Sequence, residues 1–384
     1  MTSAISSRLL RAGLASLIAV PPAHAAEWSV VESASTAGGA DVNPGLQVKD
    51  DGTRTSFAVD ANAQVTRSTE ATELTLLPVL HLVRYPGVEQ LDGERASLDV
   101  GYSLTRARWS LGLTTAATRE STLTSELGTT GLTDVHAHRD TISVTAAPQW
   151  VQSERLSAGA DLTYLRTAYP DAGNTDLYGS TYSNASLDAS YRLSPTTSVA
   201  LGVSGGRFDS DRPDGSSDSR QVTASFNTTI FEWISFTASG GPSWVAARHS
   251  TDRGLAYTLG IVGSLPRSTL TVSTSSVLSP IGYGVLTRSE GWNLSWAWRF
   301  TERTELHATY NSARTRDVLS ELGLEFSEAR YWHAGAGVRQ RLSEQWSVSA
   351  ELGESSQQQL PAREYAHGHV AYLSINWSAR PRVF

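Results

Sequence analysis

The alternation of apolar and polar side chains is clearest between Gly291 and Tyr310. Five large apolar residues there occupy every second position, with small or polar residues between them: Trp292, Leu294, Trp296, Trp298 and Phe300. In a β-strand this period of two places all five side chains on one face. A short polar connection, Thr301 to Arg303, leads into a second alternating run. The stretch therefore predicts a β-hairpin with a tight turn.

Similar strand-like runs recur at nearly even spacing along the rest of the chain. Alternation is plain in 98–104, 199–203 and 346–352, and the predicted strands run from Pro44–Lys49 to His369–Trp377. In total we predict about eighteen strands, each long enough to cross a membrane at a tilt.

The connections between these runs alternate between short and long. Short ones include 152–155, 301–304 and 343–345, whereas 120–139, 279–291 and 355–368 are long. Tight periplasmic turns at one end and long extracellular loops at the other are typical of outer-membrane barrels. The short turns also resemble one another, as in Ser153-Glu154-Arg155, Thr301-Glu302-Arg303 and Ser343-Glu344-Gln345.

The N-terminal region divides into two predicted segments before the barrel. In residues 1–25, Arg8 and Arg11 precede an apolar segment, and Ala23-His24-Ala25 offers a cleavage site before Ala26. This order predicts a secretory signal peptide. Residues 26–43 are small and polar and are expected to form a flexible lead-in. The barrel is then expected over 44–384.

Membrane crossing by a helix is not predicted beyond the signal, because no segment there approaches the roughly 20 apolar residues that a spanning helix needs. The predicted fold class is all-β: a transmembrane antiparallel up-and-down β-barrel of about 16–18 strands, in the outer membrane. An array of soluble β-sandwiches is the alternative, but it does not explain the alternation of turns and loops.

The composition excludes several kinds of partner and site. The 384-residue chain has a formal net charge of -7, a single lysine and no cysteine. It has no basic tail, so no nucleic-acid partner is expected. Disulfides and thiolate metal sites are excluded.

Charged residues occur on the polar faces of the predicted strands. If the apolar faces meet lipid, these charges must face the lumen, because an arginine at the lipid midplane costs about 2–4 kcal/mol. They either form salt bridges that stiffen the interior or make a wet wall that guides a hydrophilic solute. The lumen-facing candidates are Asp99, Asp161, Asp188, Arg299, Arg339, Arg341 and Glu351.

Tryptophans near the predicted strand ends fit the aromatic girdles at the two membrane interfaces. Those beside the long loops could alternatively stack against sugar rings. The predicted interface anchors are Trp109, Trp150, Trp233, Trp292, Trp298 and Trp346.

One loop offers the residue types of a hydrolase: Ser121, Ser125, Glu126, His136 and His138. Their spacing fixes no mutual geometry, and a catalytic triad is defined by geometry. The histidine pairs 136/138 and 367/369 lack a third metal ligand. We therefore predict no enzyme activity, no metal and no cofactor.

The segment 121–131, followed by Pro148-Gln149-Trp150 and Ser153-Glu154-Arg155, resembles a family of uncharacterised porin-type outer-membrane β-barrels. These occur beside exopolysaccharide and PEP-CTERM/exosortase systems of Gram-negative bacteria. The resemblance implies fold and location, and it transfers no catalytic residues. The terminal Phe384 is similar to outer-membrane assembly signals, which implies the barrel assembly machinery as a partner; Pro381 and Arg382 depart from that pattern.

Two functions remain open at this point. The first is a porin-like channel for a hydrophilic solute, with polysaccharide suggested by the resemblance alone. The second is a non-conducting structural or surface-interaction barrel that acts through its long extracellular loops, especially 120–139.

Overall fold

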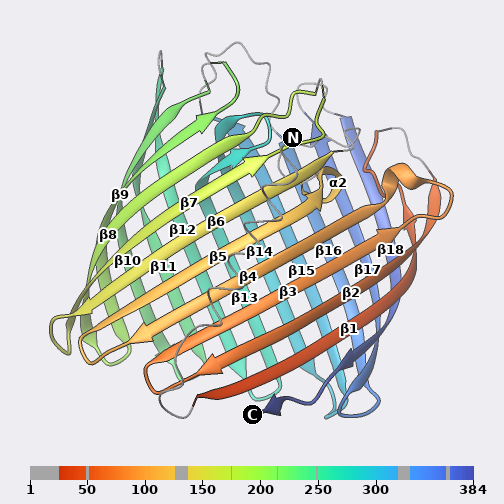
Figure 1. Ribbon diagram of the computed structural model, residues 1–384, viewed down its shortest axis with the longest axis horizontal. Coiled ribbons are helices and arrows are strands. Elements are labelled where there is room, and N and C mark those ends of the chain that lie inside the picture. Colours follow the sequence, from red (N-terminus) through yellow and green to blue (C-terminus); the bar gives the residue numbers. More distant parts are fainter. Residues whose placement is uncertain are drawn as a thin grey trace.

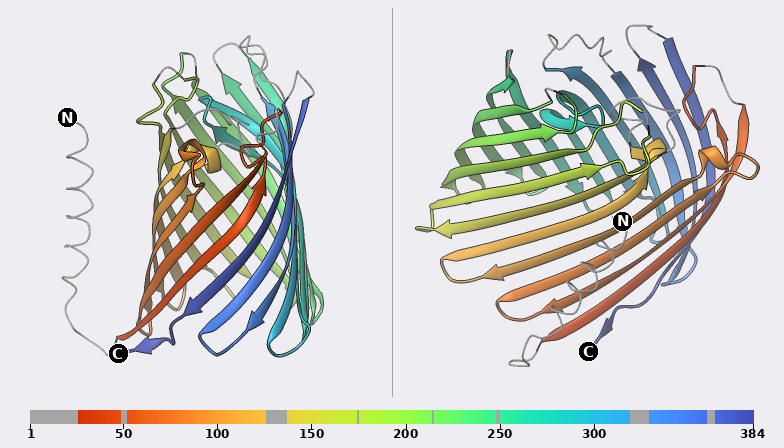
Figure 2. Two further views of the ribbon diagram at one scale, coloured as in Figure 1. Left: turned by 90° about the vertical axis from the view of Figure 1, so that its right-hand side faces the viewer. Right: turned by 45° about the horizontal axis from the view of Figure 1, so that its top comes forward.

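The described strands of the computed structural model form one closed antiparallel barrel (Figures 1 and 2). The structure describes residues 26–48, 52–125, 137–173, 175–213, 215–247, 250–318, 329–359 and 364–384. Each strand pairs with its sequence neighbours, and the first and last long strands, β1 and β18, pair along 33–42 and 369–378 to close the ring. The all-β barrel prediction is confirmed.

The described residues form eighteen long strands and one two-residue strand. The long strands are β1 (Glu27–Val42), β2 (Thr53–Ser68), β3 (Thr72–Arg84), β4 (Gly93–Thr105), β5 (Trp109–Ser121), β6 (His138–Val151), β7 (Leu156–Ala168), β8 (Ser180–Ser194), β9 (Thr197–Ser210), β10 (Ser217–Phe231), β11 (Ile234–Ala247), β12 (Thr251–Leu265), β13 (Ser268–Ile281), β14 (Val285–Arg299), β15 (Thr304–Asp317), β16 (Ala329–Arg341), β17 (Trp346–Gln359) and β18 (Glu364–Ser378). The short strand β19 (Arg382–Val383) pairs with the start of β1. Two single helical turns, η1 (Glu89–Leu91) and α2 (Thr122–Ser125), lie in connections.

The outward face of the wall is apolar. On β7 to β9 the outward residues Leu162, Leu187 and Leu201 are 52, 63 and 68% exposed. Large exposed apolar side chains in a closed barrel have no second sheet to cover them, so their solvent is lipid. None of the helices in the described residues is long and apolar enough to cross a membrane.

All connections at one end of the barrel are short, whereas the long connections lie at the other end, together with the short 282–284 (Figure 1). The three similar turns share one hydrogen-bonding pattern. The hydroxyl of Ser343 accepts bonds from the N–H groups of Gln345 and Trp346 at 3.2 and 3.1 Å. The hydroxyls of Ser153 and Thr301 do the same for the residues two and three positions later. The Ser or Thr hydroxyl thus accepts hydrogen bonds from backbone N–H groups that have no partner strand within the turn.

The turn between β2 and β3 belongs to the same set, although its sequence was not recognised as similar. The hydroxyl of Thr69 accepts bonds from the N–H groups of Ala71 and Thr72 at 3.4 and 3.0 Å. The hydroxyl-Glu pattern is present in Thr69-Glu70, but a different residue follows it.

The prediction of a flexible lead-in over 26–43 is wrong. Those residues form β1, which pairs with β2 and β18. The small residues that suggested a loose segment serve close packing, since a Cβ at Gly39 would collide with the ring of Tyr372. The predicted first strand, 44–49, is instead a turn over its described residues.

Two predicted long loops are largely strand. Residues 279–291 contain the end of β13 and the start of β14, leaving only 282–284 between the strands. In 355–368, β17 extends to Gln359 and β18 begins at Glu364. Several strands therefore extend further at the end with long connections than the sequence pattern indicated.

Candidate functional site: the charged lumen

The acidic candidates lie on the inward face of one side of the barrel. Asp161 and Asp188 are on the neighbouring strands β7 and β8, in the alternation opposite to the outward Leu162 and Leu187. Asp99 lies on β4, opposite Leu77 of β3 and Ala116 of β5, and its strand neighbours Leu98 and Val100 face outward. The hydroxyl of Thr163 donates to Asp161 at 2.8 Å. This part of the wall is polar and acidic.

The basic candidates converge at the short-turn end of another part of the lumen. Arg299 (β14), Arg339 and Arg341 (β16) line one cavity of about 480 Å³, which we call the arginine cavity. Its lining also includes Arg303 and the carboxylates of Glu302, Glu305 and Glu344. Glu305 of β15 lies between two of the arginines, because it is in register with Arg299 on one side and Arg339 on the other. Asp60 of β2 also lines this cavity. The sequence analysis did not single out Glu305 or Asp60, although each falls on the polar face of its strand.

Closure of the barrel sets the two groups across from each other. In a ring of eighteen strands, a strand faces the one nine positions away, so β7 faces β16 and β8 faces β17. Asp161 is thus carried by the wall opposite Arg339 and Arg341. Glu351, the seventh candidate, lies on β17 next to Tyr372 in register, on the arginine side. The arginine side is mixed in charge, because Asp60, Glu305 and Glu351 lie on it as well, whereas the three candidates on the other side are all acidic. Such an unequal distribution of charge creates a field across a lumen, and low-dielectric walls strengthen it.

Ion pairing does not join these candidates to each other. Within the described part of the chain, none of the seven forms a salt bridge with another described residue. The guanidinium of Arg299 donates to the backbone carbonyl of Pro266 at 3.3 Å instead. This arrangement does not match the expectation that the same charges fill the interior as salt bridges.

The lumen face of β10 to β13 carries mainly small hydroxyl and amide side chains. They alternate with the outward apolar residues and form an uncharged polar wall between the acidic and basic sides. Its members include Thr223, Ser225, Asn227, Ser235, Thr237, Ser239, Thr258, Thr271, Ser273 and Ser275.

Salt bridges do occur higher in the lumen, near the long connections. Glu120 of β5 is close to Arg95 of β4 at 3.9 Å and to Arg139 of β6 at 3.7 Å. On the neighbouring side, the buried carboxylate of Asp41 accepts a bond from the Tyr372 hydroxyl at 2.9 Å. Sequence reasoning missed both groups because their members come together only through strand register.

The end of the β13–β14 hairpin folds into the mouth of the barrel (Figure 2, right). Pairing between β12 and β13 stops at Tyr257 and Ser276, and beyond that point β13 pairs only with β14. The backbone carbonyls of Gly282 and Gly284 accept bonds from the Tyr178 N–H at 2.8 Å and the Ser210 hydroxyl at 2.9 Å. The hairpin tip is therefore tied to the β7–β8 connection and to the end of β9.

Apolar packing and one arginine hold the same hairpin against the inner wall. Leu286, 1% exposed, packs with the buried Phe208 and Val245 of β9 and β11. The Arg288 guanidinium donates to the Leu255 carbonyl at 2.9 Å and lies 3.3 Å from the Asp252 carboxylate. This cluster places a buried apolar core inside the lumen, where the sequence analysis expected an extracellular loop.

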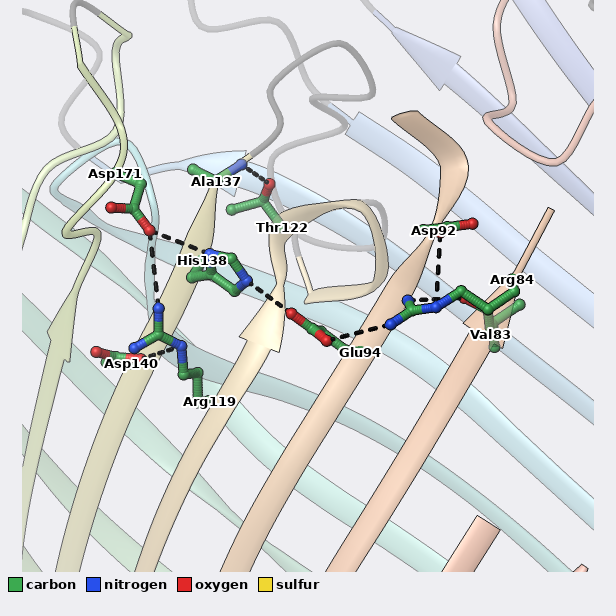
Figure 3. Close-up of polar contacts among 10 residues, drawn as sticks. All are labelled: Val83, Arg84, Asp92, Glu94, Arg119, Thr122, Ala137, His138, Asp140 and Asp171. Atoms are coloured by element: carbon green, nitrogen blue, oxygen red, sulfur yellow. Dashed lines mark hydrogen bonds and ion pairs between the residues drawn. The ribbon is translucent and has the colours of Figure 1, made fainter. Parts of the chain in front are cut away.

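The loop residues considered for catalysis do not form a triad in the described residues. His138 faces outward, and its Nδ1 and Nε2 lie 3.1 Å from the carboxylates of Asp171 and Glu94, respectively (Figure 3). Ser121 is its cross-strand neighbour and is buried. Both imidazole nitrogens are engaged by carboxylates, which leaves neither to accept a proton from Ser121 in this arrangement. Glu126 and His136 lie outside the described residues.

The histidine pair 367/369 lies on the outward face of β18, where His367 stacks on Tyr365. Across the part of the chain that the structure describes, no group of three or more potential ligands could hold a metal ion.

The predicted interface anchors face outward, and most lie at the short-turn end. Trp109 pairs with Trp150, and Trp346 with Trp377. Trp233 stacks on Phe231, and Trp298 meets Phe300 edge to face. Trp292 lies in the middle of β14, because that strand begins earlier than predicted. The anchoring role of these residues remains a prediction.

These features define the class of protein. A closed antiparallel barrel with an apolar outer face, short turns at one end and long connections at the other is an outer-membrane β-barrel. The chain is located in the outer membrane.

Comparison with known proteins gives no closer identity. No family model matches the sequence, and no curated protein matches it. The resemblance to the porin-type family therefore remains a resemblance.

Among solved structures, OpdL of Pseudomonas aeruginosa is similar over 92% of this chain and 98% of its own, with 10% identity and a TM-score of 0.45. OccK2 (OpdF) of the same organism, in complex with glucuronate, covers 91% and 97% with 9% identity and a TM-score of 0.48. The FrpB iron transporter from Neisseria meningitidis covers 92% and 81% with 11% identity and a TM-score of 0.49. Likeness at this level says nothing about function.

Proposed function

We propose that this barrel is a porin-like channel for a hydrophilic solute. The observation that carries the proposal is the unequal distribution of charge across the lumen, with acidic candidates on one side and arginines mixed with carboxylates on the other. Asp161 and Asp188 lie on strands that face the strands of Arg339, Arg341 and Glu351. A barrel wall with this arrangement attracts and orients polar solutes, whereas a closed interior would be stiffened best by direct ion pairs.

The chemistry of the wall supports a hydroxylated solute. The uncharged wall of β10 to β13 offers hydroxyl groups that donate and accept hydrogen bonds, as sugars do. The arginine cavity offers guanidinium groups that can bond an anionic group through two donors, beside carboxylates that can accept bonds from hydroxyl groups. Polysaccharide fragments are thus the solutes to test first, and the link to exopolysaccharide systems rests on the family resemblance.

Planar-bilayer recordings test the channel. We expect stepwise currents from the folded protein, with a permeability ratio that depends on the arginine cavity. In R339Q/R341Q, anion preference should fall about fivefold per charge, because a charge at about 4 Å in water is worth about 1 kcal/mol. The matched control is R155Q, in a short turn of the same kind that does not line the cavity. An equal shift in R155Q would mean that the cavity does not determine selectivity.

The alternative is a non-conducting barrel that binds a partner through its long connections. The inward β13–β14 hairpin favours it, because a packed apolar cluster occupies part of the mouth. Absence of any stepwise current from correctly folded protein would overturn the channel proposal and leave this alternative.

A further inference from the structure

The outward face carries a second arrangement of arginines, independent of the lumen and of channel activity. Arg220 of β10, Trp244 of β11 and Arg253 of β12 are directly in register across three strands. These three residues are on the outward face. Val222 and Leu255 lie two positions after Arg220 and Arg253, on the same face of their strands, and are 43 and 57% exposed. Two exposed arginines therefore flank one tryptophan just above the apolar belt.

Arg220, Trp244 and Arg253 lie at the level of the lipid headgroups of the outer leaflet. Arg220 lies near the start of β10, Trp244 near the end of β11 and Arg253 near the start of β12, all at the end with long connections. Tryptophan prefers the membrane interface, and arginine at that level can reach lipid headgroups. The two arginine strands are two strand spacings apart, about 10 Å, so both flexible side chains can converge above Trp244.

An apolar groove on the same outward face leads to Arg220. It has a volume of about 750 Å³, and its lining includes Leu162, Tyr164, Ala185 and Gly205, with Arg207, Asp218 and Arg220 at its upper end. Gly205 is the register partner of Arg220, and small residues at this position and at Ala185 make the surface concave. Its lower part is apolar and its upper end carries two arginines and one aspartate, an arrangement that fits an acyl chain below a phosphate.

The local charge is positive among the described residues. Four arginines face outward on β7, β9, β10 and β12, namely Arg166, Arg207, Arg220 and Arg253, against Asp209 and Asp218, which gives 4 − 2 = +2. Arg207 bonds both carboxylate oxygens of Asp209, at 2.8 and 3.1 Å. Arg220 and Arg253 form no salt bridge with another described residue.

A second outward cluster on β3 to β6 has the opposite balance. There Arg84 and Arg119 face four carboxylates around His138, those of Asp92, Glu94, Asp140 and Asp171, so acidic residues outnumber arginines (Figure 3). Its arginines lie within 4 Å of carboxylates. The two clusters lie at the same end of the barrel and differ in charge. Variants of the second cluster therefore serve as a control for the effect of position at the membrane interface alone.

We propose that Arg220, Arg253 and Trp244, with the groove that ends at Arg220, bind a phosphorylated lipid of the outer leaflet. The guanidinium groups bond the phosphate through paired donors, and one acyl chain lies along Ala185 and Gly205. The site would hold one lipid in a fixed place on the wall and orient the barrel in the leaflet.

Lipid binding is measured with the full detergent-folded protein, using native mass spectrometry and phosphatidylcholine vesicles that contain lipid A. We expect R220Q/R253Q to weaken lipid A binding about tenfold or more, because charge-assisted hydrogen bonds are lost. The matched control R84Q/R119Q should bind as the unchanged protein does. Heat-modifiable gel mobility confirms that each variant is folded.

Two further arms identify the ligand. Lipid A stripped of its phosphates should bind the unchanged protein about as weakly as intact lipid A binds R220Q/R253Q. The G205L variant should bind lipid A more weakly, because the leucine fills the groove without changing the charge. Equal loss in both double variants, or equal binding of the dephosphorylated lipid, would overturn the proposal. Displacement of lipid A by inorganic phosphate at comparable concentration would also overturn it, since the site would then bind a small anion.

Discussion

At the scale of single residues, Asp41 shows how a buried polar group is held inside this wall. Its carboxylate is 4% exposed and accepts a bond from the Tyr372 hydroxyl at 2.9 Å. Tyr85, in the β3–β4 connection, also bonds it; burial, together with the Asp41 charge, raises the pKa of the Tyr85 hydroxyl, which therefore remains a donor. Gly39 leaves room for the Tyr372 ring.

Removing one of these donors should destabilise the barrel. We expect Tyr372→Phe to lower the free energy of unfolding by about 1–3 kcal/mol, because Asp41 loses a partner while it stays buried. The measurement is the urea midpoint of the folded, heat-modifiable band. Tyr365→Phe is the control, since Tyr365 is 56% exposed on the outward face. A similar loss in both variants would argue against a specific role for the Asp41 bond.

Residues of this kind differ in how far sequence predicts them. The inward orientation of Asp161 or Arg339 follows from local alternation, because neighbouring apolar residues must face lipid. The contact of Asp41 with Tyr372 depends on the register of β1 against β18, and these residues are 331 positions apart. No local signal specifies that register, so the pair could not have been found from the sequence alone.

At the scale of elements, the four capped turns form a repeated device. Each uses one Ser or Thr hydroxyl to satisfy two backbone N–H groups. Substituting Thr301→Ala should cost about 1 kcal/mol, as for other side-chain caps of backbone donors. Urea midpoints measure this cost. Glu302→Gln, in the middle of the same turn, should leave the midpoint unchanged, and an equal effect there would contradict the capping explanation.

The inward hairpin is an element whose role can be separated from barrel stability. Leu286→Ala removes buried apolar contact worth about 2–5 kcal/mol in a packed site. We expect the hairpin to leave the mouth and the unitary conductance to rise. Leu352→Ala is the control, because that leucine is 68% exposed to lipid on the outward face. Unchanged conductance in folded Leu286→Ala would mean that the hairpin does not limit the current.

The sequence misled us about this hairpin for a physical reason. Pro280, Gly282 and Gly284 are residues typical of turns, and Gly284 does adopt a positive φ of 71°. They bend a strand pair that continues beyond the membrane, and apolar residues such as Leu286 then pack inside the lumen. Local composition indicates the bend but not its direction, which tertiary packing decides.

At the scale of the whole molecule, closure determines which residues face each other. With eighteen strands β7 faces β16, whereas a ring of sixteen would set β7 against β15. The sequence predicted the barrel and the approximate strand number, but it assigned 26–43 to a lead-in. The field across the lumen therefore followed from the closed structure and could not be derived from strand patterns.

The outward arginines at the upper strand ends have a consequence for how the barrel enters the membrane. Arg220 and Arg253 lie at the end that must cross the hydrocarbon if the short turns remain in the periplasm. An arginine at the midplane costs about 2–4 kcal/mol, so their passage slows insertion. The same barrier opposes movement in the reverse direction. Once these side chains lie at the outer surface, they slow any movement of the barrel back towards the periplasm.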